Sequence, residues 1–109
     1  MAATIGMFEQ AVLLSILSLN DDAYGRTVLQ DAQQRLGRGV AAGAVYATLD
    51  RLEAKGLVRS TLAPGTPRRD GRVRRYYAVT ASGVRALNES KRATERMWRG
   101  LSWPVKGRA

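Results

Sequence analysis

Residues 40–58, VAAGAVYATLDRLEAKGLV, have the pattern of a single helix with one apolar side. Val45, Leu49 and Leu52 recur at helical spacing, so they form a stripe that a protein core would cover. Gly56 follows the last apolar turn, where a glycine in the left-handed conformation commonly ends a helix. The sequence therefore predicts a helix that stops at Gly56 and is followed by an extended run.

The opposite side of this helix carries mostly short side chains. On a helical wheel it holds Gly43, Ala44, Ala47, Asp50, Arg51 and Ala54. A helix that is apolar on one side and nearly bare on the other can lie deep in a groove, such as the major groove of DNA. An ordinary amphipathic helix with a solvated, alanine-rich face would show the same pattern, so this helix alone leaves both interpretations open.

The chain is short and lacks residues that many enzymes use for catalysis. Its 109 residues include no histidine and no cysteine, so an imidazole base and a thiolate nucleophile are both absent. The nine acidic residues are scattered, and no glycine-rich phosphate-binding motif is present. We therefore expect one domain that is not an enzyme and uses no metal ion or cofactor. So short a chain often completes its core with a second subunit.

The N-terminal segment lacks the features of a targeting signal. Residues 1–22 have no early basic cluster, and Glu9 precedes the apolar part, which argues against a signal peptide. No apolar run is long enough to span a membrane. We expect a cytoplasmic protein.

The positive charge is concentrated in the second half of the chain. Residues 1–54 carry four arginines and six acidic residues, whereas residues 55–109 carry fourteen lysines or arginines and three acidic residues. The overall net charge of +9 therefore comes entirely from the second half. This asymmetry predicts a polyanionic partner, either nucleic acid or an anionic membrane.

Two further helices are expected before the helix predicted within residues 40–58. Residues 8–19 are apolar enough to be buried on several sides, by the same domain or by a second subunit. Residues 20–22 form a turn in which either aspartate could cap a helix over residues 24–36. Residues 37–39 end that helix, and residues 40–41 could form a very short strand. Three helices with a glycine-containing turn before the last outline a helix-turn-helix.

After Gly56 the sequence period changes to two. Residues 57–62 and 72–80 suit strands, and the loop between them holds two prolines and two glycines, which predicts a hairpin. Five arginines lie between positions 68 and 75. A run of arginines usually forms a solvated face. Here the run lies on a hairpin that follows the helix expected to enter a groove, so we favour contact with phosphates. Alternation places Tyr77 and Val79 on the core face, and Arg74 and Tyr76 on the other.

A last helix is expected over about residues 81–100, with Thr80 as its N-cap and Ser82 as the alternative. Its apolar stripe is interrupted at Ser90 and Lys91. A helix of this length cannot lie wholly on so small a domain, so a second subunit is expected to cover it. The residues expected at this dimer interface are Phe8, Leu13, Val84, Leu87, Met97, Trp98 and Leu101.

Several short motifs occur over about residues 8–90. They are Tyr24-Gly25, Gly43-Ala44-Val45-Tyr46, Leu49-x-Arg51-Leu52-Glu53-x-x-Gly56-Leu57-Val58, Gly71-Arg72, Arg74-Arg75-Tyr76-Tyr77-x-Val79-Thr80, and Gly83 with Leu87. In this order and spacing they resemble the motifs of PadR-family transcriptional regulators, which are winged helix-turn-helix proteins.

The resemblance implies an α+β fold that is mostly α, with three N-terminal helices, a two-stranded β-wing and a C-terminal dimerisation helix. The winged helix-turn-helix domain would span residues 1–80 and the dimerisation helix with its tail residues 81–109. The resemblance also implies a homodimeric repressor of transcription on double-stranded DNA, with a palindromic operator, release by a small molecule or other signal, and no membrane partner.

Carried over by position, the resemblance also assigns contacts with DNA. Tyr24, Arg26, Tyr46 and the wing arginines would touch the backbone, whereas Thr48 and Arg51 would reach bases. The full expected set is Tyr24, Arg26, Gly43, Ala44, Tyr46, Ala47, Thr48, Arg51, Arg68, Arg69, Arg72 and Arg74. The chain departs from the family where alanines replace the usual Ser or Thr near the start of the third helix. With so few base-reading side chains, half-site spacing and DNA shape are expected to contribute to specificity.

Trp98 has two interpretations. It could anchor the dimer interface, since a buried tryptophan contributes a large apolar area. Alternatively, it could line a cavity between subunits and stack on a small aromatic effector, as the resemblance implies for some members of the family. Arg96 and Arg99 beside it favour a planar acid.

Two other classes of function remain open at this point. The same basic half could serve an RNA-binding or anionic-surface-binding module. The alanine-rich third helix could instead belong to a ligand-binding dimeric adaptor with weak DNA recognition.

Overall fold

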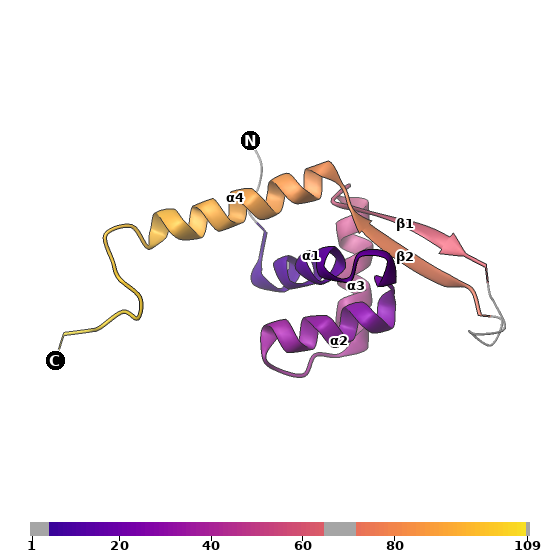
Figure 1. Ribbon diagram of the computed structural model, residues 1–109, viewed down its shortest axis with the longest axis horizontal. Helices are drawn as coiled ribbons and strands as arrows, with labels where there is room; N and C mark the ends of the chain where they lie inside the picture. Colours follow the sequence, from indigo (N-terminus) through magenta and orange to yellow (C-terminus); the bar gives the residue numbers. More distant parts are fainter. Residues whose placement is uncertain (1–4, 65–71, 109) are drawn as a thin grey trace.

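The computed structural model describes residues 5–64 and 72–108 of the chain. In order, the elements are α1 (Met7–Leu19), the short 3-10 helix η1 (Asn20–Asp22), α2 (Gly25–Leu36), α3 (Ala42–Ala54), β1 (Val58–Ala63), β2 (Arg74–Val79) and α4 (Ala81–Met97). Figure 1 shows the first three helices grouped together, with the β1–β2 hairpin projecting to one side and α4 extending to the other. The predicted fold, three helices followed by a wing and a last helix, is confirmed. Within the described ranges, none of the helices combines the length and apolarity that a membrane span requires.

The core forms where the apolar stripe of α3 meets α1 and α2. Val45, Leu49 and Leu52 are fully buried, as their spacing predicts. They share one cluster with Val12, Leu13, Ile16, Ala23, Val28 and Val58. Burial of this many apolar side chains at the point where three helices cross is the main stabilisation available to so small a domain.

Leu13 lies inside this core, with an exposed fraction of 0 %. Its assignment to the dimer interface is therefore wrong, because its side chain is already covered by the same chain. The large apolar side chains that α1 exposes are instead Met7, Leu14 and Leu17.

The end of α3 is set by Gly56, as predicted. Its φ is 75°, a left-handed value that a glycine adopts without strain. The Gly56 amide donates to the Glu53 carbonyl at 2.9 Å, and the Leu57 amide donates to the Leu52 carbonyl at 2.9 Å. These two bonds satisfy carbonyls that the helix end would otherwise leave unpaired, and they turn the chain into β1.

The start of α4 is joined to the end of α3. The Thr80 hydroxyl accepts a hydrogen bond from the Gly83 amide at 3.1 Å, which confirms Thr80 as the N-cap. The same hydroxyl donates to the Gly56 carbonyl at 2.6 Å. At Gly83 a Cβ would lie 2.2 Å from the Leu57 carbonyl oxygen, so α4 approaches as closely as it does only because this residue has no side chain.

The hairpin is a two-stranded antiparallel sheet in which Ser60 lies opposite Tyr77 and Thr61 opposite Tyr76. Tyr77 and Val79 pack against the core, as the alternation predicts. The other edge of β2 is met by the residues before α2, because the Tyr77 amide donates to the Ala23 carbonyl at 2.9 Å. A β-bridge pairs Tyr24 with Tyr76 at the same place. The wing is thereby held against the start of α2.

The start of α2 differs from the prediction. Neither aspartate of residues 20–22 caps it; both belong to η1, and Tyr24 occupies the N-cap position. The Thr27 hydroxyl reaches back and accepts a hydrogen bond from the Tyr24 amide at 3.0 Å. The cap of α2 is therefore supplied by Thr27, a residue of its own first turn.

Two other segments also differ from the prediction. Residues 40–41 form no strand, and the Val40 carbonyl accepts a hydrogen bond from the Gln33 side-chain amide at 3.0 Å instead. Helix α4 ends at Met97 rather than near residue 100, and the following turn passes through Gly100 at a φ of 84°.

Candidate nucleic-acid interface

The exposed side of α3 is nearly bare, as the helical wheel predicts. Gly43, Ala44, Ala47 and Ala54 are all exposed. A Cβ built on Gly43 would meet no heavy atom within 4 Å. Another surface can therefore approach the backbone of α3 closely along this side.

Thr48 does not belong to that exposed side, so its expected contact with bases is wrong. Its exposed fraction is 1 %, since it lies one turn from both Val45 and Leu52 and points with them into the core. Its hydroxyl donates to the Ala44 carbonyl at 2.8 Å and accepts from Arg51 Nη2 at 2.9 Å. Thr48 thus contacts Arg51, which is exposed, rather than the solvent.

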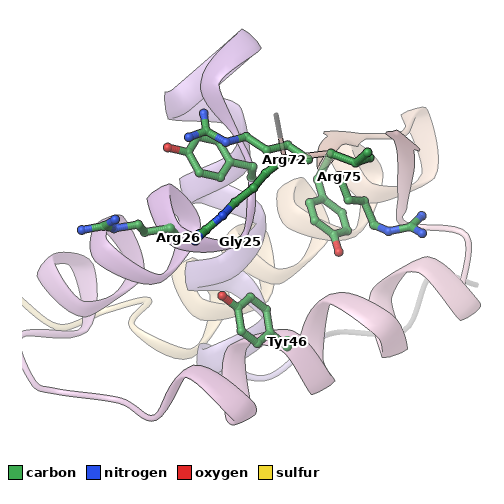
Figure 2. Close-up of a pocket in the computed structure, with 9 residues that line it drawn as sticks. Gly25, Arg26, Tyr46, Arg72 and Arg75 are labelled. Atoms are coloured by element: carbon green, nitrogen blue, oxygen red, sulfur yellow. The ribbon is translucent and has the colours of Figure 1, made fainter. Parts of the chain in front are cut away.

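A hollow of about 390 Å³ lies between the start of α2, the exposed side of α3 and the start of β2 (Figure 2). It brings together side chains that are far apart in the sequence. Those lining it are Tyr24, Gly25, Arg26, Tyr46, Arg72, Val73, Arg74, Arg75 and Tyr77. Four of these side chains are arginines and three are tyrosines, which is the composition expected of a surface that contacts phosphate groups.

Most residues expected to contact the DNA backbone line this hollow. Tyr24, Arg26, Tyr46, Arg72 and Arg74 do so. The exposed side of α3 borders the hollow through Tyr46. Sequence reasoning did not include Arg75 in the expected set, although it stands beside Arg74. Arg68 and Arg69 lie outside the described residues.

Arg74 is held by an aromatic pair. Its Cζ lies 4.1 Å from the centre of the Tyr24 ring, a distance at which the cation is attracted to the ring face. The Tyr76 ring meets the Tyr24 ring edge to face, with 5.6 Å between ring centres. These contacts join α2 to the wing and place the Arg74 guanidinium at the hollow.

Tyr46 depends on the absence of a side chain at Gly25. A Cβ at Gly25 would lie 2.4 Å from Tyr46 Cε1, so only glycine lets the ring lie against the first turn of α2. Figure 2 shows Tyr46 reaching from α3 toward Gly25. Tyr46 is still 45 % exposed, so part of its side chain remains open to a partner.

A polar chain connects the wing to the end of α3. Arg75 Nη1 donates to Ser60 Oγ at 2.9 Å, and Ser60 Oγ donates to Glu53 Oε2 at 2.6 Å. Sequence reasoning missed this chain, because only the strand register brings Ser60 and Arg75 together. It stabilises the orientation of the hairpin relative to α3.

Tyr77 also lines this hollow. Burial raises the pKa of its phenol above the ordinary value of 10.0, while Arg75 opposes the rise and Asp50 and Glu53 add to it. Tyr77 is therefore neutral at physiological pH.

Residues 13–89 match the Transcriptional regulator PadR-like family, which covers more than half of the chain. The chain belongs to this family. The resemblance noted in the sequence is confirmed, and the assignment to a family of transcriptional regulators agrees with a protein that is not an enzyme.

Relatives of this PadR-like chain support the assignment. Transcriptional regulator Rv3488 of Mycobacterium tuberculosis is 40 % identical over 91 residues, which cover 82 % of this chain and 80 % of the relative. The crystal structure of a PadR family transcriptional regulator from Eggerthella lenta is 28 % identical, with a TM-score of 0.64 over 82 % of this chain and 75 % of the other. A PadR-like transcription factor from Bacteroides fragilis is 26 % identical, with a TM-score of 0.68 over 84 % of both chains.

The PadR-like chain also presents an apolar surface on the side of α4. A groove of about 440 Å³ lies between α1 and α4, lined by Gln10, Leu14, Leu17, Val84, Leu87, Asn88, Lys91 and Thr94. We call it the α1–α4 groove. Beyond it, Met97 is 72 % exposed, and Trp98 and Leu101 are also open. Of the other residues expected at a dimer interface, Phe8 and Leu87 are partly buried against the core.

Proposed function

We propose that this PadR-like regulator is a homodimeric repressor that binds double-stranded DNA at a palindromic operator. The observation that carries the proposal is the bare side of α3 beside a hollow lined by arginines from α2 and β2. Helix α3 lies in the major groove, where short side chains allow close approach to base edges. The wing and the start of α2 lie along the phosphates.

The phosphate contacts come from side chains that the protein already holds in place. Arg74 is stacked on Tyr24, and Tyr46 is seated against Gly25, so little freedom is lost when a phosphate is bound. Arg26 and Arg72 add charge on either side. By sequence, Arg68 and Arg69 belong to the same wing.

The dimer forms through the α1–α4 groove. Val84 and Leu17 are exposed on facing helices, and the apolar groove continues toward Met97 and Trp98 at the end of α4. A second copy covers this surface by placing its own α4 there. A twofold axis then presents two α3 helices to successive major grooves, which gives the operator its palindromic symmetry.

Sequencing of genomic DNA fragments captured by the intact protein tests the proposal. We expect an enriched palindromic motif with half-sites about 10 base pairs apart, lying at promoters whose transcription falls when the protein is present. Fragments without a shared motif, together with equal affinity for RNA of the same length, would contradict the proposal and favour a basic RNA-binding module. The function requires access to genomic DNA and hence a cytoplasmic location.

Release by a small molecule is part of the proposal. Trp98 is the C-cap of α4 and is exposed, and its neighbours in the sequence, Arg96 and Arg99, favour a planar aromatic acid as the ligand. Binding of such an acid is expected to quench Trp98 fluorescence, measured with Trp103→Phe to remove the second indole. If planar acids leave the emission unchanged while Trp98→Ala lowers the melting temperature, Trp98 is an interface anchor only.

A further inference from the structure

Arg51 is the cationic residue of α3, and it stands on a side where its neighbours are too short to reach far into a groove. Gly43, Ala44 and Ala47 occupy the same exposed side in the turns before it. A side chain that recognises a base from this side therefore has to be long, and arginine is long enough and carries several donors.

The Arg51 guanidinium is held by the buried hydroxyl of Thr48. The hydroxyl proton of Thr48 is used by the Ala44 carbonyl at 2.8 Å, so the oxygen lone pairs are left for Arg51 Nη2 at 2.9 Å. Because Thr48 is 1 % exposed, the hydroxyl has no solvent to compete with Arg51. Thr48 lies one turn before Arg51, so the hydrogen bond draws the guanidinium toward the N-terminal part of α3.

We propose that Arg51 recognises one guanine in each half-site and that Thr48 is the residue that positions it. This inference rests on the proposed function, in which α3 occupies the major groove. Arginine pairs with the O6 and N7 atoms of guanine through two donors. The hydrogen bond to Thr48 uses one donor of the guanidinium and leaves others free for the base. It also restricts a flexible side chain before DNA is bound, so less freedom is lost on binding.

The test uses a duplex that the intact protein selects from a random pool, and a scrambled duplex of the same length. The quantity measured is the ratio of the two affinities. Arg51→Ala is expected to lower this ratio by about 5- to 150-fold, the range for loss of one bidentate base contact. The same variant is expected to become indifferent to replacement of the guanine.

Variants of Thr48 separate positioning from structure. Thr48→Val keeps the shape but removes the hydroxyl, and is expected to lower the affinity ratio several-fold. Thr48→Ser keeps the hydroxyl and is expected to retain most of the ratio. In an Arg51→Ala background, Thr48→Val is expected to have no further effect, because the side chain it positions is gone. Arg108→Ala is the matched control, since it removes an exposed arginine from the segment that follows α4.

Three results would overturn the inference. If Arg51→Ala lowers both affinities equally, Arg51 contacts a phosphate and not a base. If Thr48→Val lowers the ratio as much in the Arg51→Ala background as in the otherwise unmodified protein, Thr48 affects binding only through the structure of the helix. If Thr48→Val matches the unmodified protein, the hydrogen bond does not position Arg51. An unmodified protein that selects no duplex would instead refute the proposed function itself.

Discussion

Replacing Gly25 with alanine tests whether Tyr46 acts as a DNA contact held by α2. The new Cβ would lie 2.4 Å from Tyr46 Cε1, so the ring must retreat by about 1 Å to regain ordinary van der Waals contact. Tyr46 is half exposed, so its ring can turn toward solvent. An alanine in a helix gains up to about 1 kcal/mol over glycine, which offsets lost ring packing of similar size. We expect the free energy of unfolding to change by no more than about 1 kcal/mol.

DNA affinity should respond much more strongly than stability. Loss of a hydrogen bond from the Tyr46 hydroxyl to a charged phosphate costs about 1.5–3 kcal/mol, which corresponds to about 10- to 150-fold in affinity. Fluorescence anisotropy with a labelled duplex measures the affinity, and urea unfolding measures the stability. Tyr46→Phe should give a similar loss of affinity, and combining it with Gly25→Ala should add little.

Gly83→Ala is the contrasting control, because there the Cβ meets the Leu57 backbone carbonyl at 2.2 Å. A backbone carbonyl cannot turn aside, so we expect a loss of stability of about 1–3 kcal/mol or more. Unfolding of Gly25→Ala as readily as Gly83→Ala would show that the Tyr46 ring cannot turn aside. DNA binding by Gly25→Ala as tight as that of the unmodified protein would show that Tyr46 is not a DNA contact held by α2.

Three further predictions concern the wing, the dimer and the core. Arg72→Ala should weaken binding to all duplexes similarly and flatten the slope of log K against log salt by about 0.9 for each lost phosphate contact, and an unchanged slope would mean that this arginine is only solvated. Leu17→Asp should reduce the sedimenting mass from about twice 11.9 kDa to the monomer value at micromolar concentration, whereas Leu62→Asp, on an exposed leucine of the wing, should not. Because its pKa is raised in the folded protein, Tyr77 contributes stability that is fully present below pH 10.0. This contribution is lost as the pH rises through the pKa of the folded protein. Urea unfolding across this alkaline range should therefore show a steeper decline than in Tyr77→Phe, and equal declines would place the phenol in water.

Local patterns predicted the parts of the fold that depend on neighbours in the sequence. The stripe of Val45, Leu49 and Leu52 and the stop at Gly56 are set within one helix, and both are confirmed. Thr48 was misplaced because its polarity was given more weight than its position, which falls on the same stripe. Leu13 was misplaced because α1 is apolar on all sides, so periodicity could not separate buried leucines from exposed ones.

Contacts between distant segments could not be read from the sequence. The stacking of Arg74 on Tyr24 requires the β-bridge that joins the wing to the start of α2. Ser90 interrupts the apolar stripe of α4. Its hydroxyl accepts a hydrogen bond from the Ile5 amide in the N-terminal segment, at 3.1 Å. In each case the sequence shows that a polar group needs a partner, but the partner is known only from the fold.

In the proposed complex, two copies of α3 occupy successive major grooves of one duplex. Hydroxyl-radical footprinting of the intact protein on a duplex it selects tests this most directly. We predict two protected segments on each strand, centred about 10 base pairs apart and related by a twofold axis. A single protected segment, or protection without symmetry at saturating protein, would contradict the account.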